Sequence, residues 1–278
     1  MLVNLIEILK QAEAGGYAVG AFNTPNLEFV WGVLDAAEEL NVPVILAHAQ
    51  LHEPVAPLRK IGPVMVRAAE AAKVPVCVHL DHCESLDYMK EALDIGFTGV
   101  MYDGSVLSYE ENAENTRKAV SMSHAVGAGV EAELGTMAAR EGGEAAGCGP
   151  VYTDPDLAEK FCRETGIDAL APSFGTVHGI YRSEPRLDLE RVKVIHEKTG
   201  LPLVMHGGSG VSHEDYRTGI RNGLRKINYY SYMSRAGVRA AKELLDAQDV
   251  TYYHDVALAA EKAIREDAKI AMKVFAGK

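Results

Sequence analysis

The stretch PVCVHLDH, residues 75–82, is a short apolar run rich in valine that closes on polar side chains. Seven further runs of this kind occur along the chain, and amphipathic stretches separate them. They are YAVGAFN (17–23), PVILAHA (43–49), GVMYDGS (99–105), GVEAELG (129–135), ALAPSFG (169–175), LPLVMHGGSG (201–210) and LRKINYYS (224–231). Eight strands alternating with helices predict an α/β protein, either a (β/α)8 barrel or a doubly wound sheet.

The polar ends of these runs favour the barrel. Nearly every run ends in His, Asp, Glu, Asn or Ser, and a barrel gathers the C-terminal ends of its strands around one mouth, where catalytic residues lie. Because no Pro- or Ser-rich linker divides the chain, we predict a single (β/α)8 TIM-barrel domain over residues 1–278. The long Gly-, Ala- and Glu-rich connection at 136–153 predicts a mobile active-site loop.

Composition narrows the class of protein. The 278 residues carry 28 Lys and Arg against 39 Asp and Glu, a formal net charge of −11, which argues against nucleic-acid binding. No apolar run approaches the roughly 20 residues of a membrane span, and the N-terminus reads as a first helix, not a signal peptide. The four cysteines lack CxxC spacing, which suits reduced thiols. We therefore expect a cytoplasmic protein.

Three histidines close predicted strands or follow them in glycine-rich turns. His82 ends HLDH, His178 lies in GTVHG, and His206 lies in VMHGGSG. Taken singly, each is more naturally a packed residue near a loop. Three neutral imidazoles converging on one barrel mouth, with an open fourth position, are the ligand set of a catalytic Zn²⁺ ion. The convergence therefore favours a metal site.

Acidic residues accompany these histidines. Asp81 directly precedes His82 and is either a general acid/base or a carboxylate that orients an imidazole. Strand alternation puts the two on opposite faces, so both reach the mouth only if the strand ends there. Asp103 is either a metal ligand or the partner of one. Glu131 and Glu133 share a strand face, and either could instead neutralise a buried Lys or Arg.

A glycine-rich segment follows the seventh run. Gly207, Gly208, Ser209 and Gly210 offer backbone N–H groups and a hydroxyl, and Asn228 and Ser231 add donors from the next strand end. Barrels of this kind often bind phosphate at these two loops, although an ordinary turn is the alternative. Metalloprotease, serine-hydrolase, P-loop and dinucleotide-binding motifs find no match in the sequence.

Together these segments resemble the class II, metal-dependent ketose-bisphosphate aldolases, especially the tagatose-bisphosphate-like branch. The resemblance runs in order through YAVGAFN, HLDHC, VMYDGS, VEAELG, YTDP, GTVHG, LPLVMHGGSG and KIN and covers most of the chain. It implies a homodimer or homotetramer of (β/α)8 barrels. It also implies a zinc-dependent lyase that reversibly cleaves a ketose phosphate or bisphosphate into dihydroxyacetone phosphate and an aldehyde, through a metal-stabilised enediolate.

The same resemblance suggests roles for individual residues. It implies His82, His178 and His206 as zinc ligands, Glu133 as an alternative ligand, and Asp81 as the acid/base that serves the aldehyde oxygen. Substrate and phosphate contacts are predicted at Asn23, Gly179, Gly207, Gly208, Ser209, Asn228 and Ser231. Family members often hold a monovalent cation, Na⁺ or K⁺, beside the phosphate. By its place in the loop, Glu141 is the candidate base for the α-proton, with a solvated loop Glu as the alternative.

Two departures from the family pattern concern the substrate and leave the metal site alone. Tyr230 stands where the family usually has Asp or Ala, and HAQLHEP (48–54) is unusual after the second strand. The acceptor aldehyde therefore need not carry a phosphate. Arg235 and Arg239, after the eighth strand, read more naturally as solvated helix residues than as ligands of a second phosphate.

Two other functions compete with the lyase. A TIM-barrel metallohydrolase would use the same three histidines to activate water, but it usually needs a second metal or an HxH in the first strand. A non-catalytic sugar-phosphate-binding homologue is favoured by Tyr230 and opposed by the intact Asp81 and histidines.

Overall fold

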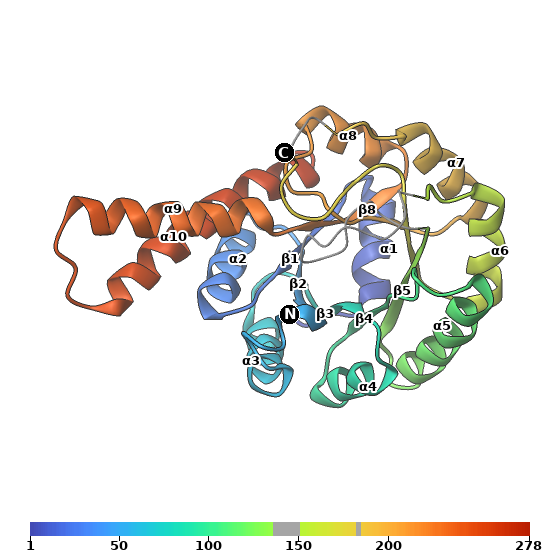
Figure 1. Cartoon of the computed structure of the whole chain (residues 1–278), viewed down its shortest axis with the longest axis horizontal. Coiled ribbons are helices and arrows are strands. Elements are labelled where there is room, and N and C mark those ends of the chain that lie inside the picture. Colours follow the sequence, from blue (N-terminus) through green and yellow to red (C-terminus); the bar gives the residue numbers. More distant parts are fainter. Residues whose placement is uncertain (136–150, 182–184) are drawn as a thin grey trace.

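Eight parallel strands close into a barrel in chain order (Figure 1). The computed structural model describes residues 1–135, 151–181 and 185–278. The strands are β1 (Val19–Asn23), β2 (Val44–Ala49), β3 (Val76–Cys83), β4 (Gly99–Tyr102), β5 (Gly129–Leu134), β6 (Ala169–Pro172), β7 (Leu203–Met205) and β8 (Leu224–Tyr229). Because β8 also pairs in parallel with β1, the predicted (β/α)8 fold is confirmed and the doubly wound alternative is excluded.

Helices surround the barrel. They are α1 (Leu5–Gly15), α2 (Leu27–Leu40), α3 (Leu58–Ala71), α4 (Leu86–Ile95), α5 (Tyr109–His124), α6 (Pro155–Thr165), α7 (Leu189–Thr199), α8 (His213–Arg221), α9 (Ser231–Ala247) and α10 (Tyr253–Phe275), with a short 3-10 turn η1 (Gln50–His52). Side chains that cap the first turn fix where several helices begin. In α5, Ser108 and Glu111 cap each other's backbone N–H groups. Within the described residues, no helix is both long and apolar enough to cross a bilayer.

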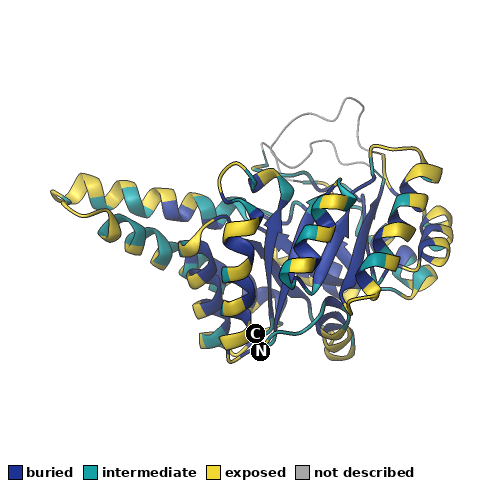
Figure 2. Ribbon diagram, turned by 90° about the horizontal axis from the view of Figure 1, so that it is seen from below, coloured by how far each residue is buried: buried dark blue, intermediate teal, exposed yellow. Residues whose placement is uncertain are grey.

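Buried apolar residues form one cluster inside the barrel and another between the barrel and the helices around it. Figure 2 shows the strands buried, whereas the helices around them are exposed on their outward sides. Leu5, Ile8 and Leu9 of α1 are buried against strand residues such as Ile45 and Val204, so α1 plugs the N-terminal end of the barrel. Burying each such side chain contributes about 1.5–3 kcal/mol. With the N-terminal end plugged, the described residues leave the C-terminal end open for a site built from strand termini.

Helices α9 and α10 form a hairpin that extends beyond the barrel wall, and α10 returns to lie beside α2 (Figure 1). Glycine permits this close packing, because a Cβ on Gly32 would lie 3.1 Å from the carbonyl oxygen of Glu261 and 3.2 Å from Ile264. The hairpin exposes several large apolar side chains: Val238, Leu245, Tyr252, Tyr253 and Leu258.

Several strands end earlier than the predicted runs. β4 stops at Tyr102 and β7 at Met205, so Asp103 and the glycines from Gly207 onward lie in loops at the barrel mouth. Gly207 has φ +63°, which takes the chain out of the extended conformation. Residues 136–150, with Glu141, lie outside the described residues. The predicted mobile loop therefore stays a prediction.

Candidate metal centre and active site

A β-bulge at the end of β3 places Asp81 and His82 together at the mouth. Leu80 pairs with Val100, but the next pair joins Cys83 to Tyr102, so β3 contains one extra residue. His82 occupies that irregularity with φ +42°, in the left-handed region that non-glycine residues seldom adopt. The bulge breaks the alternation of side chains. Asp81 and His82 therefore both reach the mouth, although an unbroken strand would separate them.

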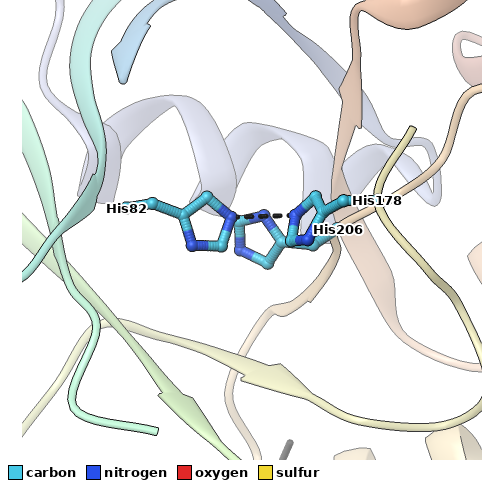
Figure 3. A group of neighbouring side chains, drawn as sticks. All are labelled: His82, His178 and His206. Atoms are coloured by element: carbon cyan, nitrogen blue, oxygen red, sulfur yellow. Dashed lines mark hydrogen bonds between the residues drawn. The ribbon is translucent and has the colours of Figure 1, made fainter. Parts of the chain in front are cut away.

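Three imidazoles meet at this mouth (Figure 3). His82 comes from β3, His178 from the segment after β6, and His206 directly follows β7. Nε2 of His82 lies 3.1 Å from Nε2 of His178, and the ring centres of His82 and His206 are 4.2 Å apart. One candidate ligand atom from each ring lies within 4.8 Å of the other two. The structure thus brings together the three histidines that the sequence singles out.

Carboxylates behind two of these rings fix which nitrogen faces the cluster. Asp103 Oδ2 lies 2.9 Å from Nδ1 of His82, and Glu131 Oε1 lies 2.8 Å from Nε2 of His206. A carboxylate accepts a hydrogen bond, so the ring nitrogen that faces it carries the proton. The other nitrogen of each neutral ring then carries the lone pair. Nδ1 of His206 is buried and has no hydrogen-bond partner among the described residues. A metal ion would satisfy it.

The spacing of the rings also fits a metal ion. Tetrahedral Zn–N bonds of about 2.0–2.1 Å place two ligand nitrogens about 3.3 Å apart, close to the 3.1 Å between His82 and His178. Burial and the neighbouring His82 lower the pKa of His206, which favours the neutral ligand form. The donor set, its tautomers and its spacing all suit a divalent cation that prefers nitrogen ligands.

Glu133 lies beside the same cluster. Its Oε2 is 3.9 Å from Nδ1 of His82, is buried, and has no hydrogen-bond partner among the described residues. Burial, with the nearby charge of Asp103, raises the pKa of Glu133 well above its usual range. Glu133, Asp103 and His82 form a second group whose ligand atoms lie within 4.8 Å of one another. The position suits an alternative ligand.

Asp81 is held by two amides at the floor of the cavity. Asn23 donates from Nδ2 to one carboxylate oxygen at 3.0 Å, and Asn228 donates to the other at 2.9 Å. Burial by itself raises the pKa of Asp81, but the nearby charges of His82 and Lys226 outweigh it and hold the pKa below its usual range. Asp81 is therefore an ionised carboxylate.

Lys226 connects Asp81 to the histidine cluster. Its fully buried ammonium donates to Oδ1 of Asn228 at 2.7 Å and pairs with Oε2 of Glu131 at 2.8 Å. The first contact turns the amide of Asn228 so that its N–H faces Asp81. The second holds Glu131, whose pKa burial raises but the charge of Lys226 lowers further, to about 2. Glu131 in turn accepts from His206, so one polar chain joins the carboxylate to the cluster.

Sequence reasoning missed Lys226, although a signal was present. Lys226 and Asn228 stand two residues apart on β8, so they share its inward face. Of the two possible roles for Glu131, partnership with a buried cation is the one observed. The sequence supplied the acid without identifying its partner.

The residues predicted to contact substrate line one cavity of about 230 Å³ beside Asp81. They are Asn23, Gly179, Gly207, Gly208, Ser209, Asn228 and Ser231, joined by His178, Leu51, His52, Tyr229 and Tyr230. Glycine is required at the loop, because a Cβ on Gly207 would lie 2.2 Å from the carbonyl oxygen of Val177. The N–H of Gly208 already donates to the carbonyl of Asn228, and Ser209 Oγ accepts from Tyr230 N–H.

Comparison with known proteins identifies the family. The sequence model of fructose-bisphosphate aldolase class-II matches residues 3–278. The chain belongs to this family. The aldolase is 40% identical over 281 residues to a fructose-bisphosphate aldolase of Staphylococcus aureus, covering 99% of this chain and 97% of that protein. It is also 40% identical over 278 residues to a 6-phospho-5-dehydro-2-deoxy-D-gluconate aldolase of Halalkalibacterium halodurans, covering 99% and 96%.

A solved structure of similar fold is also an aldolase. The YdjI aldolase from Escherichia coli K12 superposes with a TM-score of 0.89 and 36% identity, covering 99% of this aldolase and 97% of that chain. The protein is thus a class II aldolase, a lyase for reversible aldol cleavage from a metal-dependent family that acts on sugar phosphates. The comparisons favour this lyase over the metallohydrolase and over a non-catalytic binder.

Proposed function

We propose that the aldolase binds Zn²⁺ through His82, His178 and His206 and reversibly cleaves a ketose phosphate into dihydroxyacetone phosphate and an aldehyde. One observation carries this proposal: three imidazoles converge beside a clamped carboxylate, with Asp103 and Glu131 fixing the tautomers of two of them. When bound, the metal supplies a Lewis acid that stabilises negative charge developing on the substrate's carbonyl oxygen.

Asp81 transfers the proton of the oxygen that becomes the aldehyde oxygen. In cleavage its carboxylate accepts the proton of the C4 hydroxyl, the C3–C4 bond breaks, and the electron pair stays with the dihydroxyacetone phosphate half. In condensation Asp81 returns that proton to the aldehyde oxygen. The amides of Asn23 and Asn228 hold the carboxylate in place throughout. Glu141, outside the described residues, remains our proposed base for the α-proton, and in cleavage its protonated form would deliver the proton to C3 that completes dihydroxyacetone phosphate.

The glycine-rich end of the cavity is our proposed phosphate-binding site. Gly179, Gly207, Gly208, Ser209 and Ser231 line it together, and Ser231 is the first residue of the 17-residue helix α9. An anion held at this end fixes the reacting carbon relative to the metal and Asp81. A Na⁺ or K⁺ ion beside the phosphate also stays a prediction.

A homodimer or homotetramer and a cytoplasmic location are further parts of the proposal. The apolar side chains exposed on the α9–α10 hairpin support self-association, because large exposed apolar patches usually mark interaction surfaces. Cys77, Cys83 and Cys162 are buried free thiols, which suits a reducing compartment.

Proton exchange of dihydroxyacetone phosphate tests this function without knowledge of the aldehyde. In D₂O the zinc-loaded aldolase should replace one C3 proton stereospecifically, as followed by proton NMR. EDTA should abolish the exchange, and added Zn²⁺ should restore it. Exchange that EDTA leaves untouched, or no exchange by a folded, zinc-loaded sample, would contradict the proposal.

A further inference from the structure

One wall of the catalytic cavity is built from residues where the sequence departs from its family. Leu51 and His52 come from η1, and Tyr230 lies at the junction of β8 and α9. The rings of His52 and Tyr230 are 5.4 Å apart, and Tyr230 also packs at 5.7 Å against Phe29. The two departures noted in the sequence therefore form one surface.

Hydrogen bonds on both sides of His52 hold this wall in place. Before it, His48 Nε2 lies 3.0 Å from the hydroxyl of Tyr88, and Gln50 accepts from the N–H of Glu84 at 3.0 Å. After it, one oxygen of Glu53 accepts from the Tyr88 hydroxyl at 2.6 Å and from the N–H of Leu58 at 2.8 Å. The unusual HAQLHEP segment is thus a braced turn, and His52 occupies a defined position.

His52 has hydrogen-bonding capacity that the described residues leave unused. The residue is only 9% exposed, and its buried Nδ1 has no hydrogen-bond partner among the described residues. Burial lowers the pKa of His52, so the ring is neutral at pH 7 and offers one donor and one acceptor. A buried polar atom left without a partner costs about 1–3 kcal/mol. A hydroxyl group on a ligand would recover that free energy.

The charge of the cavity argues against a second phosphate. The described residues that line it include the carboxylate Asp81 but neither Lys nor Arg. Of the two arginines that the sequence singles out after β8, Arg239 lies 3.8 Å from Glu243, and Arg235 lies over the ring of Tyr232. Neither lines the cavity. The glycine-rich loop serves one phosphate, and the wall of Leu51, His52 and Tyr230 offers a second one no countercharge.

We propose that His52 and Tyr230 form the subsite for the aldehyde half of the substrate, and that this half bears hydroxyl groups and no phosphate. The substrate class is then a ketose 1-phosphate with an uncharged polyhydroxy tail. His52 forms a hydrogen bond with a hydroxyl of the tail, and the Tyr230 ring packs against its carbon chain. This inference rests on the proposed aldol function.

Competing aldehydes test the subsite. With dihydroxyacetone phosphate and zinc-loaded enzyme, kcat/KM is measured for glyceraldehyde, glyceraldehyde 3-phosphate and propanal. Each value is divided by the same variant's rate of dihydroxyacetone phosphate proton exchange, which corrects for folding and metal content. The wild type should prefer glyceraldehyde over glyceraldehyde 3-phosphate by at least about tenfold, because the described residues that line the cavity include no Lys or Arg to pair with the phosphate.

The variant His52→Phe keeps a ring for Tyr230 and removes the nitrogens. It should lower the corrected kcat/KM for glyceraldehyde about tenfold and leave that for propanal, which has no hydroxyl, within about twofold. His124→Phe, which replaces an exposed histidine paired with Asp168, is the matched control and should change neither value.

Two results would overturn the subsite while leaving the aldol function intact. One is a wild-type preference for glyceraldehyde 3-phosphate. The other is an equal loss for glyceraldehyde and propanal in His52→Phe, which would make the wall merely structural. Absence of proton exchange in the wild type would instead overturn the aldol function, and the subsite with it.

Discussion

Asp81 accepts one amide hydrogen bond at each carboxylate oxygen, and each oxygen keeps a second lone pair that can take a proton. The variant Asp81→Asn keeps the size of the side chain and removes the proton acceptor. We expect one zinc per chain by elemental analysis and a fall of at least about 100-fold in kcat for aldol turnover. His206→Ala should instead lose the metal on dialysis. Full activity of Asp81→Asn would contradict the assignment of the acid/base.

Lys226 is a buried cation on which two functional groups depend. Lys226→Met leaves the carboxylate of Glu131 buried without a countercharge, so we expect a loss of about 3–5 kcal/mol in the free energy of unfolding. Lys226→Met combined with Glu131→Gln should be less destabilised than Lys226→Met alone. Urea denaturation of metal-free samples measures both. Strictly additive losses would show that the pair is not coupled.

At the residue scale, the sequence predicted those functional side chains that lie in short, recognisable motifs. Asp81, His82, His178 and His206 lie in short motifs rich in glycine and acid, and the structure brings all four to one mouth. Lys226 was missed because its partner, Glu131, is 95 residues away in the sequence and only barrel closure joins them. Side-chain pairing across the barrel follows from its register, which no single strand encodes.

Among the elements, β3 shows where strand patterns fail. The valine-rich apolar run PVCVHLDH correctly predicted a buried strand, but strand alternation put Asp81 and His82 on opposite faces. The bulge and the left-handed conformation of His82 resolve the conflict. This conformation is strained for a non-glycine residue, and surrounding contacts such as the bond from His82 to Asp103 hold it. Sequence patterns give no warning of it.

His48, near the end of β2, makes stability depend on pH. Burial, with the charge of nearby His52, lowers the pKa of His48 to about 4 from about 6.5. The unfolded chain binds a proton in this interval and the folded one does not, so the stabilisation is present above pH 6.5 and is lost as pH falls toward 4. Between pH 7.5 and 4.5 we expect about 2 kcal/mol of the loss in unfolding free energy to come from His48.

His48→Gln isolates this contribution, because glutamine keeps a donor for the Tyr88 hydroxyl. Urea unfolding of the metal-free protein at the two pH values should show a smaller acid-induced loss in His48→Gln than in the wild type. His124→Gln, an exposed control, should behave as the wild type. An identical acid-induced loss in His48→Gln and the wild type would show that His48 contributes nothing to it.

For the whole molecule, the barrel and its open end were predictable because eight runs alternate with helices. The plug by α1 and the projecting α9–α10 hairpin were not, since amphipathic patterns show that a helix packs but not where (Figure 1). The substrate end was predictable only as a departure from the family at Tyr230 and HAQLHEP. The structure shows that His52 and Tyr230, from these two segments, lie together in one wall of the cavity.

The proposed aldol function depends on a single zinc ion that three histidines would hold at one barrel mouth. X-ray absorption at the zinc edge of the zinc-loaded aldolase, without substrate, tests it most directly. We predict a shell with three imidazole nitrogens at about 2.0–2.1 Å, and a loss of zinc in His206→Ala. A sulfur shell at about 2.3 Å, or zinc retained with unchanged imidazole scattering in His206→Ala, would contradict the account.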